Sequence, residues 1–335
     1  MNILEVKGLV TCFFTRRGIV RAVNDVSFDL QKGEVLCLVG ESGSGKTVSA
    51  LSILGLVDSP GRLTGGEVML DGEDLRQYTP EQLRLIRGKR IAMIFQDPRE
   101  SLNPVLTIGE QIMEPMKVHI NLSDREAREK ALRLLERVGV PKERLFSYPH
   151  EFSGGMNQRV MIAMALGCDP EILIADEPTS ALDVTTQSRF LELLLDLKRE
   201  KGMSMIFITH DLGIVAQIAD RVVVMYAGKA MEKGNVWQIF ENPRHPYTIG
   251  LLNSLPDVAM KREKLVPIPG QIPSLIAPPG GCVFHTRCRF AKEVCGRVVP
   301  QEATVEDGHV SACLFWDSEE VIKASKEVRV EQQAS

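Results

Sequence analysis

A glycine-rich stretch near the start of the chain carries residue types that bind a nucleoside triphosphate. The segment Gly40-Glu-Ser-Gly-Ser-Gly-Lys46-Thr47 matches the pattern G-x-x-x-x-G-K-[ST] at every fixed position. Glycines let successive backbone N–H groups turn toward phosphate oxygens, and the following helix adds its positive N-terminal end. We predict that Lys46 reaches the β- and γ-phosphates and that Thr47 ligates Mg²⁺. The other residues predicted to contact the nucleotide here are Ser42, Gly43, Ser44, Gly45 and Val48.

A second group of reactive side chains stands at residues 176–177. The apolar run 172–175 predicts a buried strand, and it ends in the adjacent carboxylates Asp176 and Glu177. Adjacent strand residues point to opposite faces, and the chain begins to bend at a strand end, so the two carboxylates can take different tasks. Asp176 would hold the Mg²⁺ shell, and Glu177 would polarise the attacking water. The alternative is a pair of solvated acids at a sheet edge.

A third group combines one serine and two glycines. Ser153, Gly154 and Gly155 precede a helix predicted over residues 160–166, and they form a second possible anion-binding helix start. One triphosphate does not need two such loops in one site. We therefore predict a two-subunit site, in which this loop covers the γ-phosphate of the partner's nucleotide. Alone, Ser-Gly-Gly is often only a helix cap.

The elements that position these residues follow an alternating pattern. Strands are predicted over residues 4–10, 20–30, 35–39, 67–72, 172–175, 205–208 and 221–226. Helices are predicted from residue 48, over 127–138 behind a Ser123/Glu126 capping box, and near 190–198 and 212–219. Such alternation indicates an α/β protein with a mostly parallel, doubly wound sheet.

Composition limits the function classes. The chain has 335 residues and a formal net charge of −4, so no global basic field would hold nucleic acid. No run approaches the roughly 18 apolar residues of a membrane span, and charges occupy the place of a signal-peptide core, so we expect a cytoplasmic chain. Prolines cluster after about residue 255, where four of the seven cysteines also lie. We predict one domain over 1–255, an irregular extension over 256–335, and a frayed polar tail in the last dozen residues.

The order of these motifs resembles the ATPase subunit of an ABC transporter over roughly residues 3–255. The resemblance implies a P-loop NTPase fold with a RecA-like parallel core, an antiparallel β subdomain and an α-helical subdomain at about 97–165. It also implies roles for three further residues. Gln96 matches the family's glutamine that touches Mg²⁺ and senses the membrane subunits. Asp183 matches the aspartate that links the two ATP sites across the dimer. His210 matches the switch histidine that contacts the γ-phosphate. An aromatic that stacks on adenine is expected just after the first strand; Phe13 fits best, with Phe14 and Val20 as alternates.

Finer features resemble one branch, the dipeptide and oligopeptide importers with their nickel-importing relatives. They are Phe152-Ser-Gly-Gly-Met156, Phe95-Gln-Asp-Pro98, Ser101-Leu-Asn-Pro104 and Asn242-Pro-Arg-His-Pro-Tyr-Thr248. Met156 departs from the family's usual glutamine and cannot hydrogen-bond as that side chain does. The branch implies an ATPase peripheral to the cytoplasmic face of the cell membrane that powers import of di- or oligopeptides, with nickel or another small solute as the other cargo. Implied partners are a second ATPase subunit, more often a homologue than a copy, two membrane permease subunits and, indirectly, an extracytoplasmic solute-binding protein.

Two other functions compete with this interpretation. A soluble ABC protein acting on DNA or the ribosome would carry a tandem cassette or long coiled coil, and the sequence has neither. A non-catalytic nucleotide-binding regulator would be expected to lack chemistry at Glu177 and His210, and both residues are present. Copurification with integral membrane subunits would support the transporter ATPase. Copurification with nucleic acid or ribosomes would support the soluble ABC protein instead.

Four cysteines remain to be explained: Cys282, Cys288, Cys295 and Cys313. Five, six and seventeen residues separate them, and none of these gaps is the C-x₂-C pair of common zinc sites. A proline-rich segment with few periodic apolar residues would gain cohesion from a bound metal or cluster. The resemblance implies a 4Fe–4S cluster, which four widely spaced thiolates suit, with zinc, or free thiols or an occasional disulfide, as alternatives. Cys12, Cys37 and Cys168 are expected to be buried packing residues.

Overall fold

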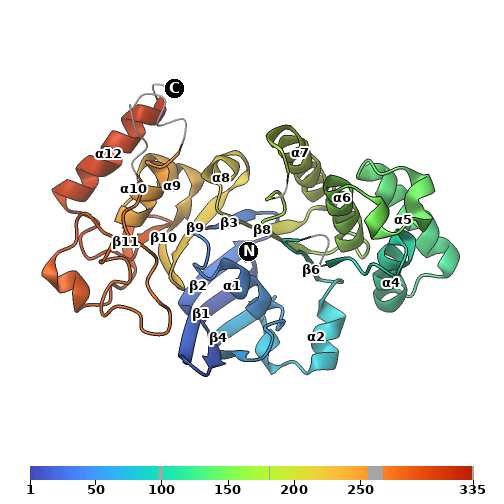
Figure 1. Ribbon diagram of the computed structural model, residues 1–335, viewed down its shortest axis with the longest axis horizontal. Helices are drawn as coiled ribbons and strands as arrows, with labels where there is room; N and C mark the ends of the chain where they lie inside the picture. The colour runs from blue at the N-terminus through green and yellow to red at the C-terminus, as the bar shows by residue number, and fades with distance from the viewer. Residues whose placement is uncertain (98–100, 181, 256–266, 334–335) are drawn as a thin grey trace. The chain divides into compact units, whose positions relative to one another are not determined.

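The computed structural model describes residues 1–97, 101–180, 182–255 and 267–333 (Figure 1). Pro98, the start of the proline-rich stretch at residues 256–266, and the last two residues of the predicted tail lie outside the described residues. The chain divides into two compact units. Unit 1 comprises residues 1, 30–34 and 77–208, and unit 2 comprises residues 2–29, 35–76 and 209–335.

Unit 1 contains three parallel strands in the order β8-β7-β6. Their bounds are β6 (Ile91–Ile94), β7 (Ile172–Asp176) and β8 (Ser204–Thr209). Every residue of β7 and β8 is buried, as expected for parallel strands covered on both faces. The predicted strands over 172–175 and 205–208 are confirmed.

The helices of unit 1 begin at side-chain caps. They are α2 (Pro80–Ile86), α4 (Ile108–Ile120), α5 (Asp124–Arg137), α6 (Gly154–Ala165) and α7 (Val184–Lys201), with short turns η2 (Lys142–Phe146) and η3 (Pro149–Glu151). The predicted Ser123/Glu126 capping box is present at α5, whose Ala127, Ala131 and Leu135 are buried on one face. The helix predicted over 160–166 is longer than expected, because it begins at Gly154 with Ser153 as its cap.

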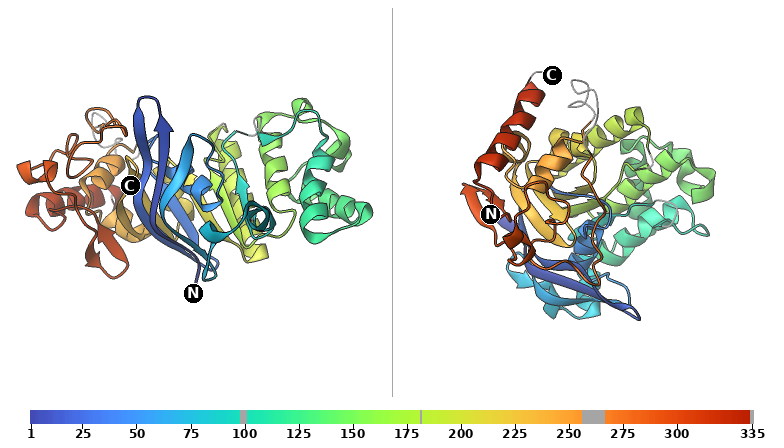
Figure 2. Two further views of the ribbon diagram at one scale, coloured as in Figure 1. Left: turned by 90° about the horizontal axis from the view of Figure 1, so that it is seen from below. Right: turned by 60° about the vertical axis from the view of Figure 1, so that its left-hand side comes forward.

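Unit 2 contains an antiparallel sheet in the order β2-β1-β4-β5, whose long strands run side by side in both views of Figure 2. Its strands are β1 (Asn2–Thr15), β2 (Gly18–Gln31), β4 (Gly61–Leu70) and β5 (Glu73–Asp74). Alternating burial along β1 and β2 puts Leu4, Val6 and Leu9 into the core. The predicted strands over 4–10, 20–30 and 67–72 correspond to parts of this sheet.

The other strands of unit 2 follow the order β11-β12-β10-β9-β3. They are β3 (Val35–Val39), β9 (Arg221–Tyr226), β10 (Lys229–Asn235), β11 (Ala303–Glu306) and β12 (His309–Ser311). β3 and β9 pair in parallel, as their continuous apolar runs predict, whereas β10, β11 and β12 pair antiparallel. The helices of unit 2 are α1 (Lys46–Ile53), α8 (Leu212–Ile218), α9 (Val236–Glu241), α10 (Pro246–Leu252) and α12 (Glu319–Gln333), with turns η1 (Leu75–Gln77) and η4 (Glu293–Gly296).

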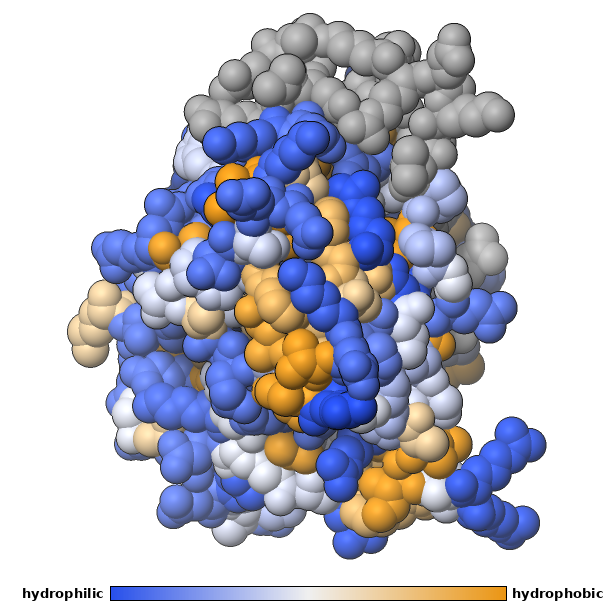
Figure 3. Space-filling model, turned by 90° about the vertical axis from the view of Figure 1, so that its left-hand side faces the viewer, coloured by the Kyte–Doolittle hydropathy of each residue, from blue (hydrophilic) through white to orange (hydrophobic). Residues whose placement is uncertain are grey.

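The C-terminal segment is more regular than its sequence suggested. Its hairpin β11–β12 pairs with β10, and α12 packs against α9 and α10. The prediction of a frayed tail over the last dozen residues is wrong for residues 324–333, because they belong to α12, in which Val321, Ala324 and Val328 recur at helical spacing and are buried. The face in Figure 3, to which this segment contributes, is largely hydrophilic with a few apolar patches.

Nowhere in residues 1–97, 101–180, 182–255 and 267–333 is a helix both long enough and apolar enough to span a membrane.

Candidate ATP site and four-cysteine segment

The predicted phosphate loop joins β3 to α1 in unit 2, which is the strand–loop–helix order that its motif requires. Two glycines fit only because they have no side chain. A Cβ on Gly40 would lie 2.1 Å from the carbonyl oxygen of Met225, and one on Gly45 would lie 2.4 Å from that of Ala22. Both glycines also have positive φ values, 155° and 102°, so the loop is held in a conformation that other residues resist.

The ammonium group of Lys46 lies over the inside of the loop. Its Nζ donates to the carbonyl oxygens of Gly40 at 2.7 Å and Glu41 at 3.1 Å, and to Ser44 Oγ at 3.4 Å. The residue is 4% exposed, so a positive charge is held in the buried interior of the loop. Thr47 follows directly at the start of α1 and is partly exposed.

Glu41 is a residue of this loop for which the motif predicts no role. Its backbone N–H donates to the Tyr247 hydroxyl at 2.9 Å, and its carboxylate accepts two hydrogen bonds from Arg287, at 2.7 and 3.0 Å. The contacts span 206 and 246 residues of sequence, so no local pattern could have indicated them.

The two predicted catalytic carboxylates lie at the end of β7 in unit 1. Asp176 is the last residue of the strand and is 2% exposed, whereas Glu177 leaves the strand with a φ of 42°. The N–H of Glu177 donates to the Ile208 carbonyl at 2.9 Å. The amide of Gln96, just beyond β6, donates to the Glu177 carboxylate at 3.2 Å. The structure thus brings together two of the residues predicted to act in hydrolysis.

A groove of about 770 Å³ in unit 1 gathers other predicted residues. Its lining includes Gln96, Ser153, Gly154, Gly155 and Asp183. Ser153 caps α6 by accepting the N–H of Met156 at 3.4 Å, and beyond its chain neighbours and its own helix backbone nothing lies within 4 Å of a Cβ built on Gly154. The start of α6 therefore faces open space, as an anion-binding helix start requires.

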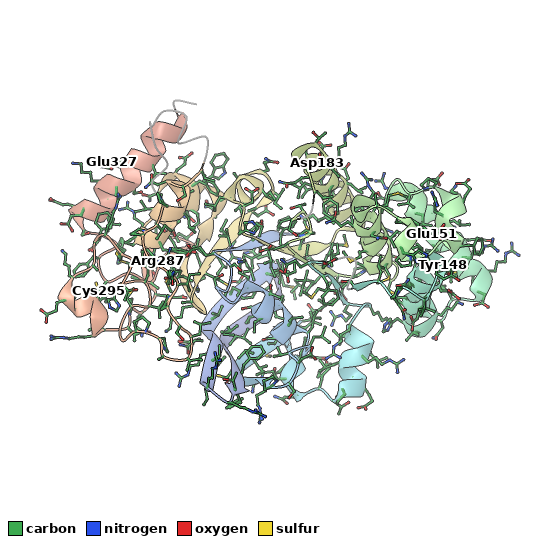
Figure 4. All side chains as sticks on the ribbon, viewed as in Figure 1. Tyr148, Glu151, Asp183, Arg287, Cys295 and Glu327 are labelled. Carbon is green, nitrogen blue, oxygen red and sulfur yellow. The ribbon has the colours of Figure 1, made fainter. Side chains whose placement is uncertain are left out.

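Asp183 and His210 have distinct settings. Asp183, labelled in Figure 4, caps α7 by accepting the backbone N–H of Thr186 at 3.0 Å and its hydroxyl at 2.7 Å. The Thr186 hydroxyl is the main cause that lowers the pKa of this carboxyl, so Asp183 stays ionised at neutral pH. His210 follows β8, belongs to unit 2 and is exposed.

Phe13 lies inside β1 rather than after it, which corrects the expected position. Its backbone pairs with Gly61, and a Cβ on Gly61 would lie 2.6 Å from the Phe13 ring. The ring therefore packs over a glycine while Phe13 stays partly exposed. The alternate Phe14 is 40% exposed and has the Arg62 guanidinium 4.8 Å from its ring centre.

The four C-terminal cysteines line one small pocket of unit 2, together with Phe284, Phe290 and Phe315 among others. Two of the sulfur atoms accept backbone N–H groups: Cys295 from Lys292 at 3.5 Å and Cys313 from Phe315 at 3.4 Å. Within the described ranges, no three His, Cys, Asp or Glu side chains are grouped as a single metal ion requires. Cys12, Cys37 and Cys168 are buried, as predicted.

Comparisons with known proteins agree with the motifs. Residues 23–180 match the family model described as ABC transporter, and residues 231–295 match the one described as oligopeptide/dipeptide transporter, C-terminal region. The dipeptide transport ATP-binding protein DppD of Bacillus subtilis is 49% identical, with 94% of this chain and 96% of that protein covered. DppD of Escherichia coli is 46% identical, and the match covers 94% of this chain and 97% of that protein.

Solved structures show the same fold. One is an ATP-binding cassette in a dimeric post-hydrolysis state with ADP and phosphate, with a TM-score of 0.64, 29% identity, and 70% of this chain and 98% of that chain covered. Another is CbiO1 of Clostridium perfringens, part of an ABC transporter complex. Its TM-score is 0.62 and its sequence identity 27%, and the match covers 78% of this chain and 99% of that chain. The chain belongs to the ABC transporter ATPases, in the branch that carries the oligopeptide/dipeptide transporter C-terminal region. It has the cassette's mixed α/β fold and is an ATPase.

Proposed function

We propose that this chain hydrolyses ATP to power import of di- or oligopeptides by an ABC transporter on whose cytoplasmic side it sits as a peripheral subunit. The observation that carries this proposal is the joint presence of the phosphate loop and the oligopeptide/dipeptide transporter C-terminal region in one chain. Its relatives named dipeptide transport ATP-binding proteins support the same cargo.

The chain's own residues divide the work as follows. The loop around Lys46 binds the phosphates, because a buried positive charge beside the start of α1 favours a polyanion. Thr47, Asp176 and Gln96 would hold Mg²⁺, which neutralises charge on the phosphates. Glu177 takes the proton of the attacking water and is oriented by the Gln96 amide.

Other residues would contact the nucleotide or the partner subunit. His210 contacts the γ-phosphate, and Phe13 supports the adenine. Ser153, Gly154 and Gly155 cover the nucleotide of a second ATPase subunit, and Asp183 links the two sites. We propose a homologous second subunit, with two membrane permease subunits and a solute-binding protein completing the transporter.

The experiment is transport by the reconstituted complex. The chain, its ATPase partner and the two permease subunits are placed in proteoliposomes with the solute-binding protein, and uptake of a labelled dipeptide is measured with Mg·ATP. ATP-dependent dipeptide uptake that stops with Glu177→Gln is expected. Uptake of Ni²⁺ with no uptake of di- or oligopeptides would contradict the cargo.

We also propose that the four cysteines hold a structural 4Fe–4S cluster, with zinc as the alternative. Three observations of this structure support the fit: all four residues line one pocket, apolar and aromatic side chains line it with them, and backbone N–H groups donate to two of the sulfurs. Hydrogen bonds of this kind stabilise metal-bound thiolates. When bound, the cluster would cross-link the separate stretches of the C-terminal segment that carry the four cysteines.

Metal analysis tests this proposal. Protein purified without oxygen should be brown, absorb broadly near 400 nm and contain about four irons. Cys288→Ser should bleach the absorption, whereas Cys168→Ser, outside the pocket, should retain it. Colourless anaerobic protein without iron would overturn the cluster, and stoichiometric zinc in that sample would favour the alternative.

A further inference from the structure

One arginine of the C-terminal segment is held unusually firmly. Arg287 lies between Cys282 and Cys288 in sequence, its side chain is 5% exposed, and its position in the segment is labelled in Figure 4. Its Nε donates to the Pro269 carbonyl at 2.8 Å, and Nη1 reaches the Tyr226 hydroxyl at 3.3 Å. The guanidinium therefore has a fixed direction before its main contact is considered.

That main contact is the phosphate loop. Both Nη atoms of Arg287 donate to the Glu41 carboxylate, at 2.7 and 3.0 Å, in the two-bond geometry that gives arginine its specificity. The Glu41 side chain is 29% exposed, so water screens the pair only on one side. Glu41 cannot move without breaking a largely buried charged contact, which is costly.

The backbone of Glu41 connects this contact to the phosphate-binding lysine. Its N–H is held by the Tyr247 hydroxyl, and its carbonyl oxygen accepts from Lys46 Nζ at 3.1 Å and from the N–H of Ser44 at 3.2 Å. One residue thus joins Arg287, Tyr247 and the atoms that bind phosphate.

The aromatic rings behind this contact belong to the cysteine pocket. Phe284, which lines the pocket, lies 5.2 Å between ring centres from both Tyr226 and Tyr247. The two tyrosine rings lie 4.7 Å from each other, and both residues are fully buried. The packing around the cysteines therefore continues to the residues that hold Glu41.

We propose that Arg287 is a positioning residue for the phosphate loop, and that the C-terminal segment sets the affinity for ATP through the Arg287–Glu41 pair. This inference rests on the assignment of residues 40–47 as the phosphate loop. With Arg287 in place, Glu41 and the Lys46 ammonium are held ready for the nucleotide. Without it, the loop must be ordered when the nucleotide binds, and the affinity falls.

A double-mutant cycle tests the proposal. Mg·ATP is titrated calorimetrically into the full-length parent, Arg287→Gln, Glu41→Gln and the double variant at one ionic strength. Each single variant should bind ATP about tenfold more weakly, within the range typical of coupling between sites. The double variant should be no weaker than either single one, because both remove the same contact. Arg287→Lys, which keeps the charge but not the fork, should recover part of the affinity.

Controls separate positioning from general damage. Arg289→Gln removes an equal charge from the same segment at an exposed residue, and should bind ATP like the parent. Should Arg287→Gln fail to fold, Glu41→Gln carries the test, since it leaves the C-terminal segment unaltered.

The failures are distinguishable. If Lys46→Ala loses ATP affinity while folded Arg287→Gln binds like the parent, the proposal is overturned and the phosphate-loop assignment stands. Additive losses in the double variant would also overturn it. If Lys46→Ala itself retains the parent affinity, the phosphate-loop assignment fails and this inference fails with it.

Discussion

Replacing Glu177 by glutamine isolates the proposed general base. Glu177 stands just beyond β7 at a φ of 42°, with its N–H bonded to the Ile208 carbonyl at 2.9 Å. Glutamine has the same length and can adopt the same backbone contact. Its amide oxygen can still accept from Gln96, which reaches the native carboxylate at 3.2 Å. The substitution therefore removes the charge and basicity with little change of shape.

The expected loss follows from the value of a positioned base. General-base catalysis contributes about 10²–10⁴ in rate, and a tenfold change corresponds to about 1.4 kcal/mol, so the barrier should rise by about 3–5 kcal/mol. Binding of ATP should change little, because Lys46 and the phosphate loop belong to unit 2 and are unaltered. With ATP bound and not consumed, the variant should accumulate as an ATP-locked dimer.

The assay measures phosphate release at saturating Mg·ATP, alongside a direct titration of ATP affinity and the elution volume with and without ATP. Glu192→Gln is the matched control, since it makes the same chemical change at an exposed position of α7. A Glu177→Gln protein that hydrolyses ATP within a few-fold of the parent would refute the assignment.

Two further predictions concern charge. Lys46→Ala should weaken ATP binding itself, because it removes the cation that lies over the phosphate loop; unchanged affinity in a binding titration would count against the site. Asp169→Asn should lower the free energy of unfolding at pH 7 by about 1 kcal/mol, because two exposed pairs, with Lys130 at 2.5 Å and Lys201 at 2.7 Å, are lost. Burial opposes the shift, but the two lysines lower the pKa of Asp169 overall, so its contribution is present above the unfolded pKa near 4 and fades as pH falls further. Urea unfolding at pH 7 and pH 3 should show the difference shrink, and an equal difference at both values would contradict it.

Local signals made much of the cassette predictable. The phosphate loop, the Ser123/Glu126 box and the apolar run before Asp176 each depend on neighbours within a few residues, so their sequence spacing already contains the geometry. The apolar run that predicts the first strand ends at Val10, which leaves Phe13 beyond it, whereas pairing with β4 extends β1 to Thr15. The helical spacing of Val321, Ala324 and Val328 already indicates α12, although the polar residues around them favour a tail without regular structure.

The Arg287–Glu41 contact shows where sequence reasoning reaches its limit. In the sequence, Glu41 fills a variable position of the phosphate-loop motif, and Arg287 is one of several charges among the cysteines. Only folding brings them together, because the two residues are 246 positions apart in sequence. The buried Tyr226 of β9 contacts Arg287, and the buried Tyr247 of α10 contacts Glu41. A variable motif position can hold many residue types when nothing outside the loop contacts it. Here the buried Arg287 guanidinium contacts Glu41, so the choice of glutamate is linked to the C-terminal segment, and substitutions at Glu41 and Arg287 should lower ATP affinity non-additively.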